Sequence, residues 1–348
     1  MSANSSPADG PTGENRRKPA VMYDVARLAG VSHQTVSRVI NGSTHVRAET
    51  RDRVLAAMEK LDYRPNSVAR ALVTGRSKNL GVVTFNTTLY GPASTLVGVE
   101  RAAHAAGYFI SIVSLESLER AAVLQAVERL RALGVDGLVM IAPHVASLGA
   151  LWDLPADLPV VAVEAGPQDV VAVAEVDQYE GARLATQHLL DLGHATVHHL
   201  GGPPEWIEAQ QRTAGWRDAL DAAGAKGTSP LRGDWSARSG YELGHKLLDL
   251  PGVTAIFVAN DQMALGLLRV LHERGCDVPG DVSIVGFDDI PESAYFSPPL
   301  TTVRQDFNEM GRRGLHLLLE EIAAGKRSTG RATVPASLVV RASTAPPR

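Results

Sequence analysis

The stretch YDVARLAGVSHQTVSRVIN, residues 23–41, decides the fold of the N-terminal part of the chain. Its apolar residues, Val25 and Leu28 among them, are predicted to lie on one face of a first short helix. Gly30 then allows a sharp reversal, because glycine tolerates backbone angles that other residues avoid. The hydroxyl of Ser32 can accept a backbone N–H at the start of a second helix. The pattern predicts two short helices joined by a tight turn.

The second predicted helix buries Val36 and turns a polar face outward. Its serine, glutamine and arginine side chains have the spacing that a helix needs to reach base edges in the major groove of DNA. An ordinary helical hairpin with a polar outer face is the alternative. The residues assigned to the DNA-reading face are Ser32, His33, Gln34, Thr35, Ser37 and Arg38.

A third helix is predicted from Arg51 to Leu61, because Val54, Leu55 and later apolar residues recur at helical spacing. It would close a three-helix core. The segment that follows, SVARAL at 67–72, has good helix formers but is only about two turns long, and such helices are marginal in water. We therefore expect it to be ordered only when DNA or a partner copy holds it.

Charge is unevenly distributed along the chain. The whole sequence has 34 Lys and Arg against 38 Asp and Glu, whereas residues 16–78 alone have 13 basic and 5 acidic side chains. The result is a basic head on an acidic body. Such a bias at one end of the chain, together with the helix pattern, indicates a DNA-binding domain.

Several classes of protein lack support in this sequence. Residues 1–20 have no apolar h-region of a secretory signal and are predicted to form a disordered polar tail. Cys276 is the single cysteine, which fits a cytoplasmic protein without an intramolecular disulfide. His198 and His199 are consecutive on a predicted strand and should point to opposite faces, so no metal site is predicted. No apolar run is long enough for a membrane span.

Beyond residue 79, short apolar runs alternate with longer helical stretches. This alternation predicts an α/β fold of parallel sheets flanked by helices. The length exceeds one comfortable sheet, so we expect two similar lobes with a crevice between them. The apolar runs lie at residues 80–83, 109–113, 138–141, 160–163, 197–200, 255–258 and 283–286.

Polar residues follow the predicted strands of the second half. Asn260 follows the apolar residues 256–259 and Asp288 follows 284–287, and open parallel sheets bind ligands beyond the carboxyl ends of their strands. Together with Arg212 and Trp235 they suit a sugar, because carboxylates and amides bond vicinal hydroxyls while indole stacks on the C–H face. The alternatives are that Asn260 only caps the next helix and that Trp235 is a core residue.

Residues 21–78 resemble the head and hinge of the lactose-repressor (LacI/GalR) family of bacterial transcription regulators. The resemblance covers roughly residues 21–342. It implies a homodimer whose heads bind the two halves of a palindromic operator in double-stranded DNA, with paired hinge helices that wedge a leucine into the minor groove. The further motifs are GDWSARSG (233–240), VANDQMALG (258–266), DVSIVGFDD (281–289) and PPLTTVRQDF (298–307).

The resemblance also implies roles for individual residues of the head. Gln34 and Arg38 match base-reading positions, and Leu72 matches the wedge. His33 replaces a tyrosine found in the family, so the resemblance does not determine the operator sequence at the base pairs that this side chain reads. Ala69 is assigned to the same interface, and the positions that match phosphate contacts are Ser37, Asn41, Tyr63 and Asn66.

In the core, the resemblance implies a pocket for a small-molecule effector. Glu164 and Glu208 depart from the family pattern, in which an aspartate and a small hydroxyl residue are expected, and they put a galactoside in question. Leu89 and Pro92 would contact the aglycone side. The remaining positions that match effector-binding residues are Arg212, Trp235, Asn260, Asp288, Gln305 and Phe307.

The implied organisation is a helix-turn-helix head on a two-lobed, periplasmic-binding-protein-like core. The first lobe is expected at about 79–176 and 305–333, and the second at about 177–304 and 334–345. The expected segments are a disordered tail (1–20), the DNA-binding domain (21–65), a hinge helix and linker (66–78) and the effector-binding and dimerisation core (79–348).

The sequence therefore predicts a dimeric, nucleoid-associated repressor of sugar-utilisation genes, released from DNA by a glycoside or disaccharide and needing no cofactor. A corepressor-dependent regulator with a non-sugar effector remains an alternative. A glycosidase is a second class, but Asp288 and Asp289 are adjacent and no glycosidase signature accompanies them. A sugar-binding transport protein is a third class and would need a secretory signal.

Overall fold

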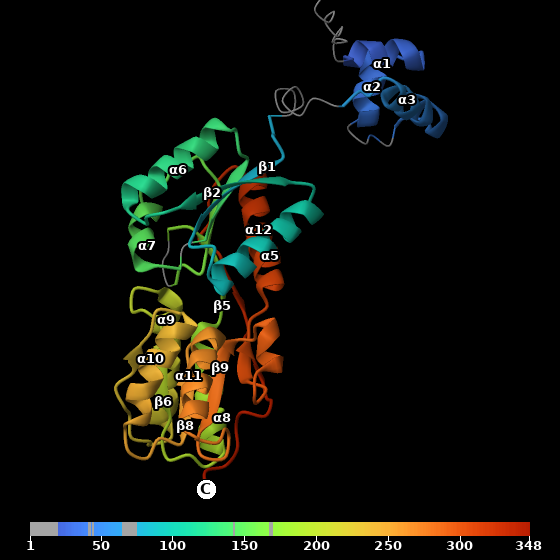
Figure 1. The fold of residues 1–348 in the computed structure, drawn as a ribbon. Helices are drawn as coiled ribbons and strands as arrows, with labels where there is room; N and C mark the ends of the chain where they lie inside the picture. The colour runs from blue at the N-terminus through green and yellow to red at the C-terminus, as the bar shows by residue number, and fades with distance from the viewer. Residues whose placement is uncertain (1–19, 41–42, 44, 65–74, 142, 167–169) are drawn as a thin grey trace, which may run out of the picture. The chain divides into compact units, whose positions relative to one another are not determined.

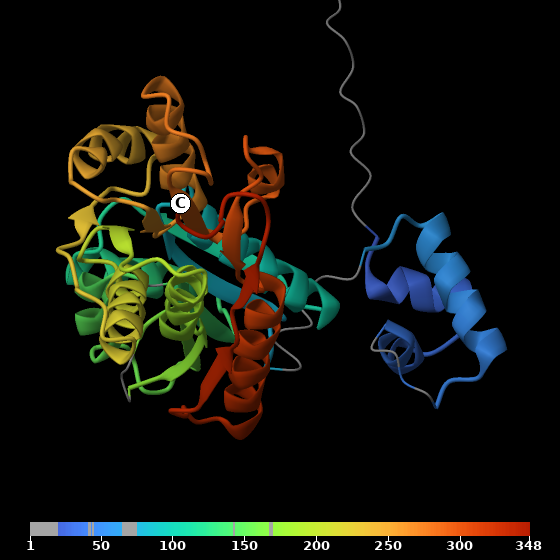
Figure 2. The same ribbon diagram turned by 90° about the horizontal axis from the view of Figure 1, so that it is seen from below.

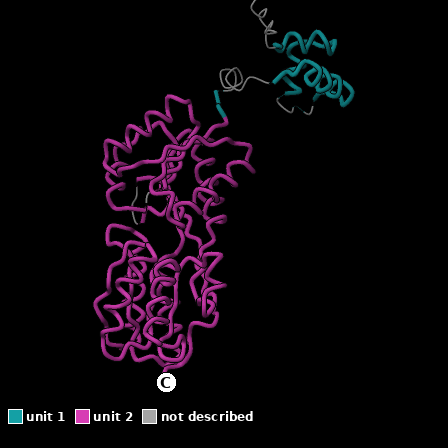
Figure 3. Tube along the Cα trace, viewed as in Figure 1, with its two compact units in different colours: residues 1–77 teal, residues 78–348 magenta. Residues whose placement is uncertain are grey.

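The computed structural model describes residues 20–348 except 41–42, 44, 65–74, 142 and 167–169 (Figure 1). The chain divides into two compact units, Met1–Ser77 and Lys78–Arg348 (Figure 3). The predicted tail up to residue 19 and the hinge segment 67–72 lie outside the described residues, and so do four predicted DNA contacts: Asn41, Asn66, Ala69 and Leu72.

The described part of the first unit contains three helices around a small apolar core: α1 (Met22–Ala29), α2 (His33–Ile40) and α3 (Ala48–Lys60). Gly30 ends α1 with a left-handed φ of 64°. The Thr35 amide donates to the Ser32 hydroxyl over 3.2 Å at the start of α2. The predicted pair of short helices with a glycine turn is confirmed.

Two leucines predicted to face this core are on the surface. Leu28 is 46% exposed and Leu55 is 49% exposed. Each lies roughly 100° around its helix from the buried stripe, and Ala29 in α1 and Ala57 in α3 occupy the core instead. Alanines allow the short helices to approach closely. The third helix also begins at Ala48, three residues before the predicted start.

The second unit is built on two six-stranded sheets. Described neighbouring strands pair in parallel, except for the antiparallel pair of β10 with β12. The first sheet has the order β11 (Arg331–Val334), β5 (Ala172–Val176), β4 (Val160–Val163), β3 (Gly137–Ile141), β1 (Asn79–Phe85), β2 (Phe109–Leu115). The second has the order β12 (Ser337–Val339), β10 (Thr301–Arg304), β9 (Ser283–Asp288), β8 (Ala255–Val258), β6 (His198–Gly201), β7 (Leu231–Arg232).

Helices cover both faces of each sheet (Figures 1 and 2). Alternation along the strands explains this, since Val82 and Val83 are both buried but pack into different apolar clusters. The first sheet carries α5 (Tyr90–Ala105) and α12 (Phe307–Ala324) on one face, and α6 (Arg120–Ala132) and α7 (Val145–Leu151) on the other. The second carries α8 (Gln178–Asp191) and α9 (Ile207–Ala222) opposite α10 (Ala237–Leu248) and α11 (Asp261–Glu273), with a 3₁₀ turn at Pro291–Tyr295.

The predicted α/β class is confirmed, and the seven apolar runs are the strands β1, β2, β3, β4, β6, β8 and β9. The chain passes between the two sheets three times, after Val176, after Arg304 and after Val334. The carboxyl end of β1 therefore lies near the carboxyl ends of the second sheet's central strands, where the pocket described below is found. In the described part of the chain, no helix has both the length and the apolar character needed to cross a membrane.

Candidate functional site

The helix α2 presents a polar surface on the first unit. Val36 and Val39 are buried in the head, while His33, Gln34 and Arg38 are exposed. The other predicted DNA-facing residues are Ser32, which is exposed, and Thr35, Ser37 and Tyr63, which are half-buried.

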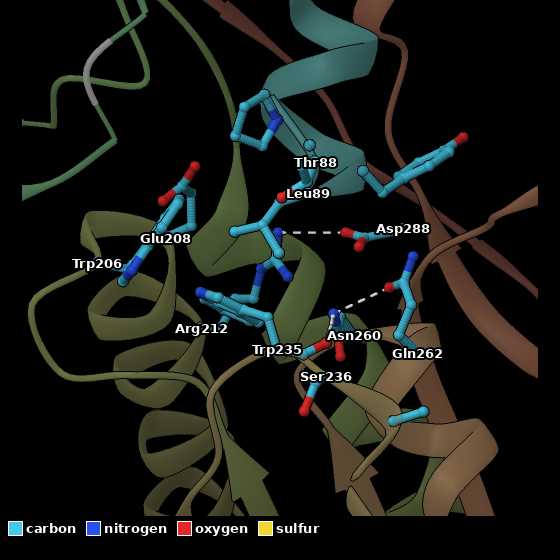
Figure 4. Close-up of a pocket in the computed structure, with 14 residues that line it drawn as sticks. Thr88, Leu89, Trp206, Glu208, Arg212, Trp235, Ser236, Asn260, Gln262 and Asp288 are labelled. Carbon is cyan, nitrogen blue, oxygen red and sulfur yellow. Dashed lines mark hydrogen bonds and ion pairs between the residues drawn. The ribbon is translucent and has the colours of Figure 1, made fainter. Parts of the chain in front are cut away.

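A cavity of about 260 Å³ opens in the second unit at the carboxyl ends of β1, β6, β8 and β9 (Figure 4). The turn after β1 supplies one wall, and the start of α9 and the loops after β7 and β8 supply the rest. Six of the predicted effector residues line it: Leu89, Pro92, Arg212, Trp235, Asn260 and Asp288. The other described lining residues are Thr88, Tyr90, Gly91, Trp206, Glu208, Ser236, Ala237 and Gln262.

The two remaining predicted effector residues line a different cavity of about 660 Å³, which shares Tyr90 with the first. Gln305 donates from Nε2 to Asp288 Oδ1 over 2.7 Å. Phe307 meets the edge of the Tyr90 ring at a centroid distance of 5.8 Å. In this arrangement Gln305 and Phe307 position residues of the first cavity and do not line it.

Arg212 is the central charge of the smaller cavity. Its side chain is 5% exposed, and Nη2 lies 3.4 Å from Asp288 Oδ1. The guanidinium also donates from Nε to Gln178 Oε1 over 2.9 Å and lies 3.8 Å from the centroid of the Phe287 ring. A buried arginine with these partners is held in one orientation, so it presents a fixed donor edge to a ligand.

Asp288 is the acidic partner of that arginine. Burial raises its pKa to about 6, while the charge of Arg212 and the hydrogen bond from Gln305 act in the opposite direction. Its φ of 108° is unusual for a residue other than glycine. Backbone strain of this kind is concentrated at functional sites, where the surrounding structure holds it in place.

Trp235 is held in the pocket by both its backbone and its neighbours. Its φ is 74°, and a Cβ on Gly202 would lie 2.2 Å from Trp235 Cη2, so only glycine leaves room for the ring. The ring meets Trp206 edge to face at a centroid distance of 5.9 Å. Trp235 belongs both to the apolar core of its lobe and to the cavity wall. It is therefore a core residue and a lining residue at the same time.

Asn260 also has two roles. Its Oδ1 accepts from the Met263 amide over 2.9 Å and caps α11, while Nδ2 donates to the Trp235 carbonyl over 3.0 Å. Asp261 faces inward, where its carboxylate accepts from the Ile290 amide over 2.9 Å. The capping interpretation is therefore right for Asn260, and the same side chain lines the cavity.

Sequence reasoning missed Trp206 and Gln178. Trp206 is the residue before α9 and follows β6 by five residues, so the rule about carboxyl ends of strands could have found it. Gln178 connects Arg212 to Gln305 across the molecule, through bonds of 2.9 and 2.7 Å. No local pattern announces such a role. Within the described residues, no cluster of His, Cys, Asp and Glu could hold a metal ion.

Two family profiles match the chain. Residues 21–66 match bacterial regulatory proteins of the lacI family, and residues 186–344 match a periplasmic binding protein-like domain. The lactose operon repressor of Escherichia coli (strain K12) is 37% identical over 336 residues, which cover 95% of this chain and 92% of that protein. The chain belongs to the lacI family of bacterial regulatory proteins.

Other similar proteins extend the comparison of this lacI-family chain. The repressor PurR of Vibrio parahaemolyticus serotype O3:K6 (strain RIMD 2210633) is 35% identical over 315 residues, 87% of this chain and 92% of that protein. The lac repressor dimer bound to operator and the anti-inducer ONPF has a TM-score of 0.84 at 36% identity, covering 94% of this chain and 100% of that one. A complex of the transcriptional regulator CelR with cellobiose has a TM-score of 0.68 at 32% identity, covering 93% and 99%.

The lactose operon repressor and PurR are transcriptional repressors and not enzymes. The lacI-family chain is accordingly a DNA-binding transcriptional repressor, and the glycosidase hypothesis is excluded. The predicted family is confirmed.

Proposed function

We propose that this repressor binds a palindromic operator as a homodimer and is released by a sugar in the smaller cavity. The observation that carries the proposal is the buried Arg212–Asp288 pair, 3.4 Å apart, beside Trp235 in one cavity. Fixed polar groups that fork onto vicinal hydroxyls, next to an indole that can stack on the C–H face, suit a sugar ring.

Similar proteins of known structure support the proposal. One solved relative is a dimer on operator DNA and another holds the disaccharide cellobiose. The cavity of about 260 Å³ is slightly smaller than the usual range for small-molecule sites, roughly 300–1,000 Å³. A single sugar ring with a small aglycone is therefore the ligand that we favour.

On the DNA side, we propose that Gln34 and Arg38 contact base edges, with His33 setting the preference at a neighbouring base pair. Ser32, Thr35, Ser37 and Tyr63 would hold the phosphate backbone or the helix start. The segment that contains Asn66, Ala69 and Leu72 would enter the minor groove, and Asn41 would contact phosphate. The protein would act on the nucleoid in the bacterial cytoplasm, with the head, hinge and two-lobed core divided as the sequence predicts.

The proposed mechanism is thermodynamic linkage between the cavity and the operator. Walls from both sheets line the cavity, since Leu89 follows β1 while Arg212 and Asp288 belong to the second sheet's side. A bound sugar therefore favours one arrangement of the two sheets, and this arrangement changes the separation of the paired hinge segments. A hundredfold loss of operator affinity requires only about 2.7 kcal/mol of coupling, an ordinary amount for allostery.

The test begins with palindromic DNA selected from a random pool by the purified protein. Fluorescence anisotropy then measures operator affinity in the presence of mono- and disaccharides. Arg38→Ala should weaken specific DNA binding by roughly 1–3 kcal/mol and leave sugar binding intact. Asp288→Asn keeps the shape of the side chain but removes its charge, so it should retain DNA binding and lose the response to sugar.

Loss of both functions in either variant would mean that the variant has unfolded, so circular dichroism of each variant is the control. Two other outcomes would contradict the proposal. A ligand that tightens operator binding would establish a corepressor. A purine or phosphorylated compound that raises the melting temperature when no sugar does would replace the sugar, an alternative that similarity to PurR favours.

A further inference from the structure

Glu208 is an acid that the sugar-binding geometry described above leaves unused. It lies in the first turn of α9, is 9% exposed, and lines the smaller cavity. Within the described part of the chain its buried Oε2 has no hydrogen-bond partner. Figure 4 shows Glu208 and Asp288 on opposite sides of Arg212. Asp288 has Arg212 and Gln305 as partners, whereas Oε2 of Glu208 has none among the described residues.

Helix-dipole stabilisation does not account for Glu208. Acids in the first turn of a helix are common because they complement the helix dipole, and exposed positions suffice for that purpose. Glu180 in α8 and Glu309 in α12 are such acids, and arginines on the next turn of the helix donate to both of them. Glu208 is buried instead, and Arg212 on the next turn of its helix is bonded to Asp288, Gln178 and the Ala259 carbonyl.

The lining of the cavity has more acidic than basic side chains. Among the described lining residues Arg212 is the only cation, while Glu208 and Asp288 are both acids. Arg212 is already engaged by Asp288, Gln178 and the Ala259 carbonyl. Burial raises the pKa of Glu208 to about 8, with the charge of Arg212 acting against the shift.

A second buried acid behaves in the same way. Burial, followed by the charge of Glu208, raises the pKa of Glu164 well above its ordinary value. Glu164 accepts from the Val176 amide over 3.0 Å, so this acid has a partner within the protein. The groups that act on Glu208 are thus Arg212 on its own helix, the backbone amide of Glu208 itself, Asp288 at the end of β9 and Glu164 after β4.

The aromatic residues of the cavity suit the same ligand. Trp206 and Trp235 both line it. An indole can stack on a sugar ring and also attracts a neighbouring cation. Trp235 Nε1, like Glu208 Oε2, is a buried polar atom without a partner among the described residues, so these two lining residues keep one unsatisfied donor and one unsatisfied acceptor.

We propose that Glu208 is a specificity-determining residue that selects an effector with a basic nitrogen, an amino sugar or its glycoside, over the neutral parent sugar. This inference rests on the proposed function, in which the cavity binds a sugar. A hydroxyl could also donate to Oε2, but an ammonium forms a charge-assisted hydrogen bond with the ionised carboxyl and favours that ionised form, which burial alone disfavours.

The experiment measures the affinity of the full chain for matched pairs of ligands by titration calorimetry. The pairs are glucose with glucosamine and galactose with galactosamine, each also as the methyl glycoside. The wild-type protein should bind the better amino sugar at least about tenfold more tightly than its parent, because hydrogen bonds to charged groups are roughly twice as strong as neutral ones.

Substitutions assign that preference to one side chain. Glu208→Gln and Glu208→Ser should reduce the ratio of the two affinities to below about threefold. Glu180→Gln is the matched control, since it removes a first-turn acid that lies outside the cavity lining, and it should leave the ratio unchanged. A general loss of folding would weaken both ligands equally and would not change the ratio.

The outcomes distinguish a failure of the role of Glu208 from a failure of the proposed sugar-responsive repressor. Neutral sugars that bind as tightly as amino sugars would overturn the role of Glu208 and leave the sugar-responsive repressor standing. A preference that survives in Glu208→Gln would also overturn it, whether or not Glu208→Ser folds. If neither kind of sugar binds while operator binding is normal, both the inference and the proposed sugar effector fail.

Discussion

At the scale of the residue, the pocket depends on side chains held in strained or crowded positions. Trp235, Asp288 and Glu164 have φ values of 74°, 108° and 57°, and all three lie in or beside the cavity. A positive φ is uncommon for residues other than glycine. The surrounding hydrogen bonds and packing maintain the strain, which places the side chains where a ligand can meet them.

Gly202→Ala tests the most crowded of these positions. The added Cβ would lie 2.2 Å from Trp235 Cη2, so the indole must move. We expect the chain to fold and to bind operator, and to bind sugar at least about tenfold more weakly, since an indole stacked on a sugar contributes on the order of 1 kcal/mol or more. Titration of sugar into both proteins measures this.

The control for that variant is Gly227→Ala, because nothing lies within 4 Å of the added Cβ there. It should bind sugar as the wild type does. Unchanged sugar affinity in Gly202→Ala would show that Trp235 is a core residue without contact to the ligand.

The raised pKa of Glu208 predicts a pH-dependent stability. In the unfolded chain this carboxyl loses its proton near the ordinary pKa of glutamate, about 4.3, whereas in the folded protein it does so at about 8. The stabilisation that Glu208 gives the folded protein is therefore fully present below its pKa in the unfolded chain, and it is lost as the pH rises through its pKa in the folded protein. Between pH 5 and 9 the wild type should lose on the order of a few kcal/mol relative to Glu208→Gln.

Tryptophan fluorescence can follow this unfolding, since all four tryptophans of the chain lie beyond residue 150, within the second unit. Asp288 and Asp261 also have raised pKa values, but they are present in both proteins and their effects largely cancel. Glu164 is part of the difference that is measured, because the charge of Glu208 raises its pKa. Parallel stability curves for the two proteins would mean that Glu208 ionises at an ordinary pH.

At the scale of the element, helices in the core approach each other through glycine. A Cβ on Gly98 of α5 would lie 2.2 Å from the Phe307 carbonyl, and one on Gly311 of α12 would lie 2.3 Å from the Gly98 carbonyl carbon. The two helices therefore pack backbone to backbone beside the first sheet. Because Phe307 begins α12, this contact also sets the position of the strand-to-helix turn that carries Gln305.

Gly98→Ala should destabilise the second unit by roughly 1–3 kcal/mol, because the backbone atoms opposite the new methyl cannot move away as a side chain could. Gly91→Ala on the same helix is the matched control, since nothing lies within 4 Å of its Cβ, and it should be neutral or slightly stabilising. Urea unfolding followed by tryptophan fluorescence compares the two. Equal stability in both variants would show that the helices separate without cost.

At the scale of the whole molecule, the start of α9 is tied to both sheets. The Ile207 amide donates to the Pro143 carbonyl over 2.8 Å, and the Val145 amide donates to the Glu205 carbonyl over 3.0 Å. These bonds join the segment before α7, on the first sheet's side, to the segment that carries Trp206 and Glu208. A ligand that contacts the start of α9 therefore acts on a direct connection between the lobes.

Linkage predicts a reciprocal effect that spans the molecule. If sugar lowers operator affinity by some factor, saturating operator must lower sugar affinity by the same factor. Calorimetric titration of sugar into the free protein and into the operator complex measures this directly, with a scrambled DNA of equal length as the control. Equal sugar affinity in the two states would exclude induction through this cavity.

The sequence by itself determined the elements whose signal is local. The turn at Gly30, the cap at Ser32 and the seven apolar strands depend on neighbouring residues, and each is present in the structure. Leu28 and Leu55 were placed wrongly, because periodicity over an eight- to thirteen-residue helix leaves the centre of the buried face uncertain by about one residue. Short strands such as β7 and β12, with two and three residues, have too little pattern to be predicted.

Only the tertiary structure decided which polar residues meet. The sequence and the resemblance predicted that eight effector residues line one pocket. Six of them line the smaller cavity, whereas Gln305 bonds to Asp288 and Phe307 packs against Tyr90 from the neighbouring cavity. The unpartnered Oε2 of Glu208 was equally invisible, because it depends on Arg212 being engaged by residues 34, 47 and 76 positions away along the chain. Burial and hydrogen bonding are properties of the packed chain, so the chemistry of the pocket follows from contacts that no local pattern encodes.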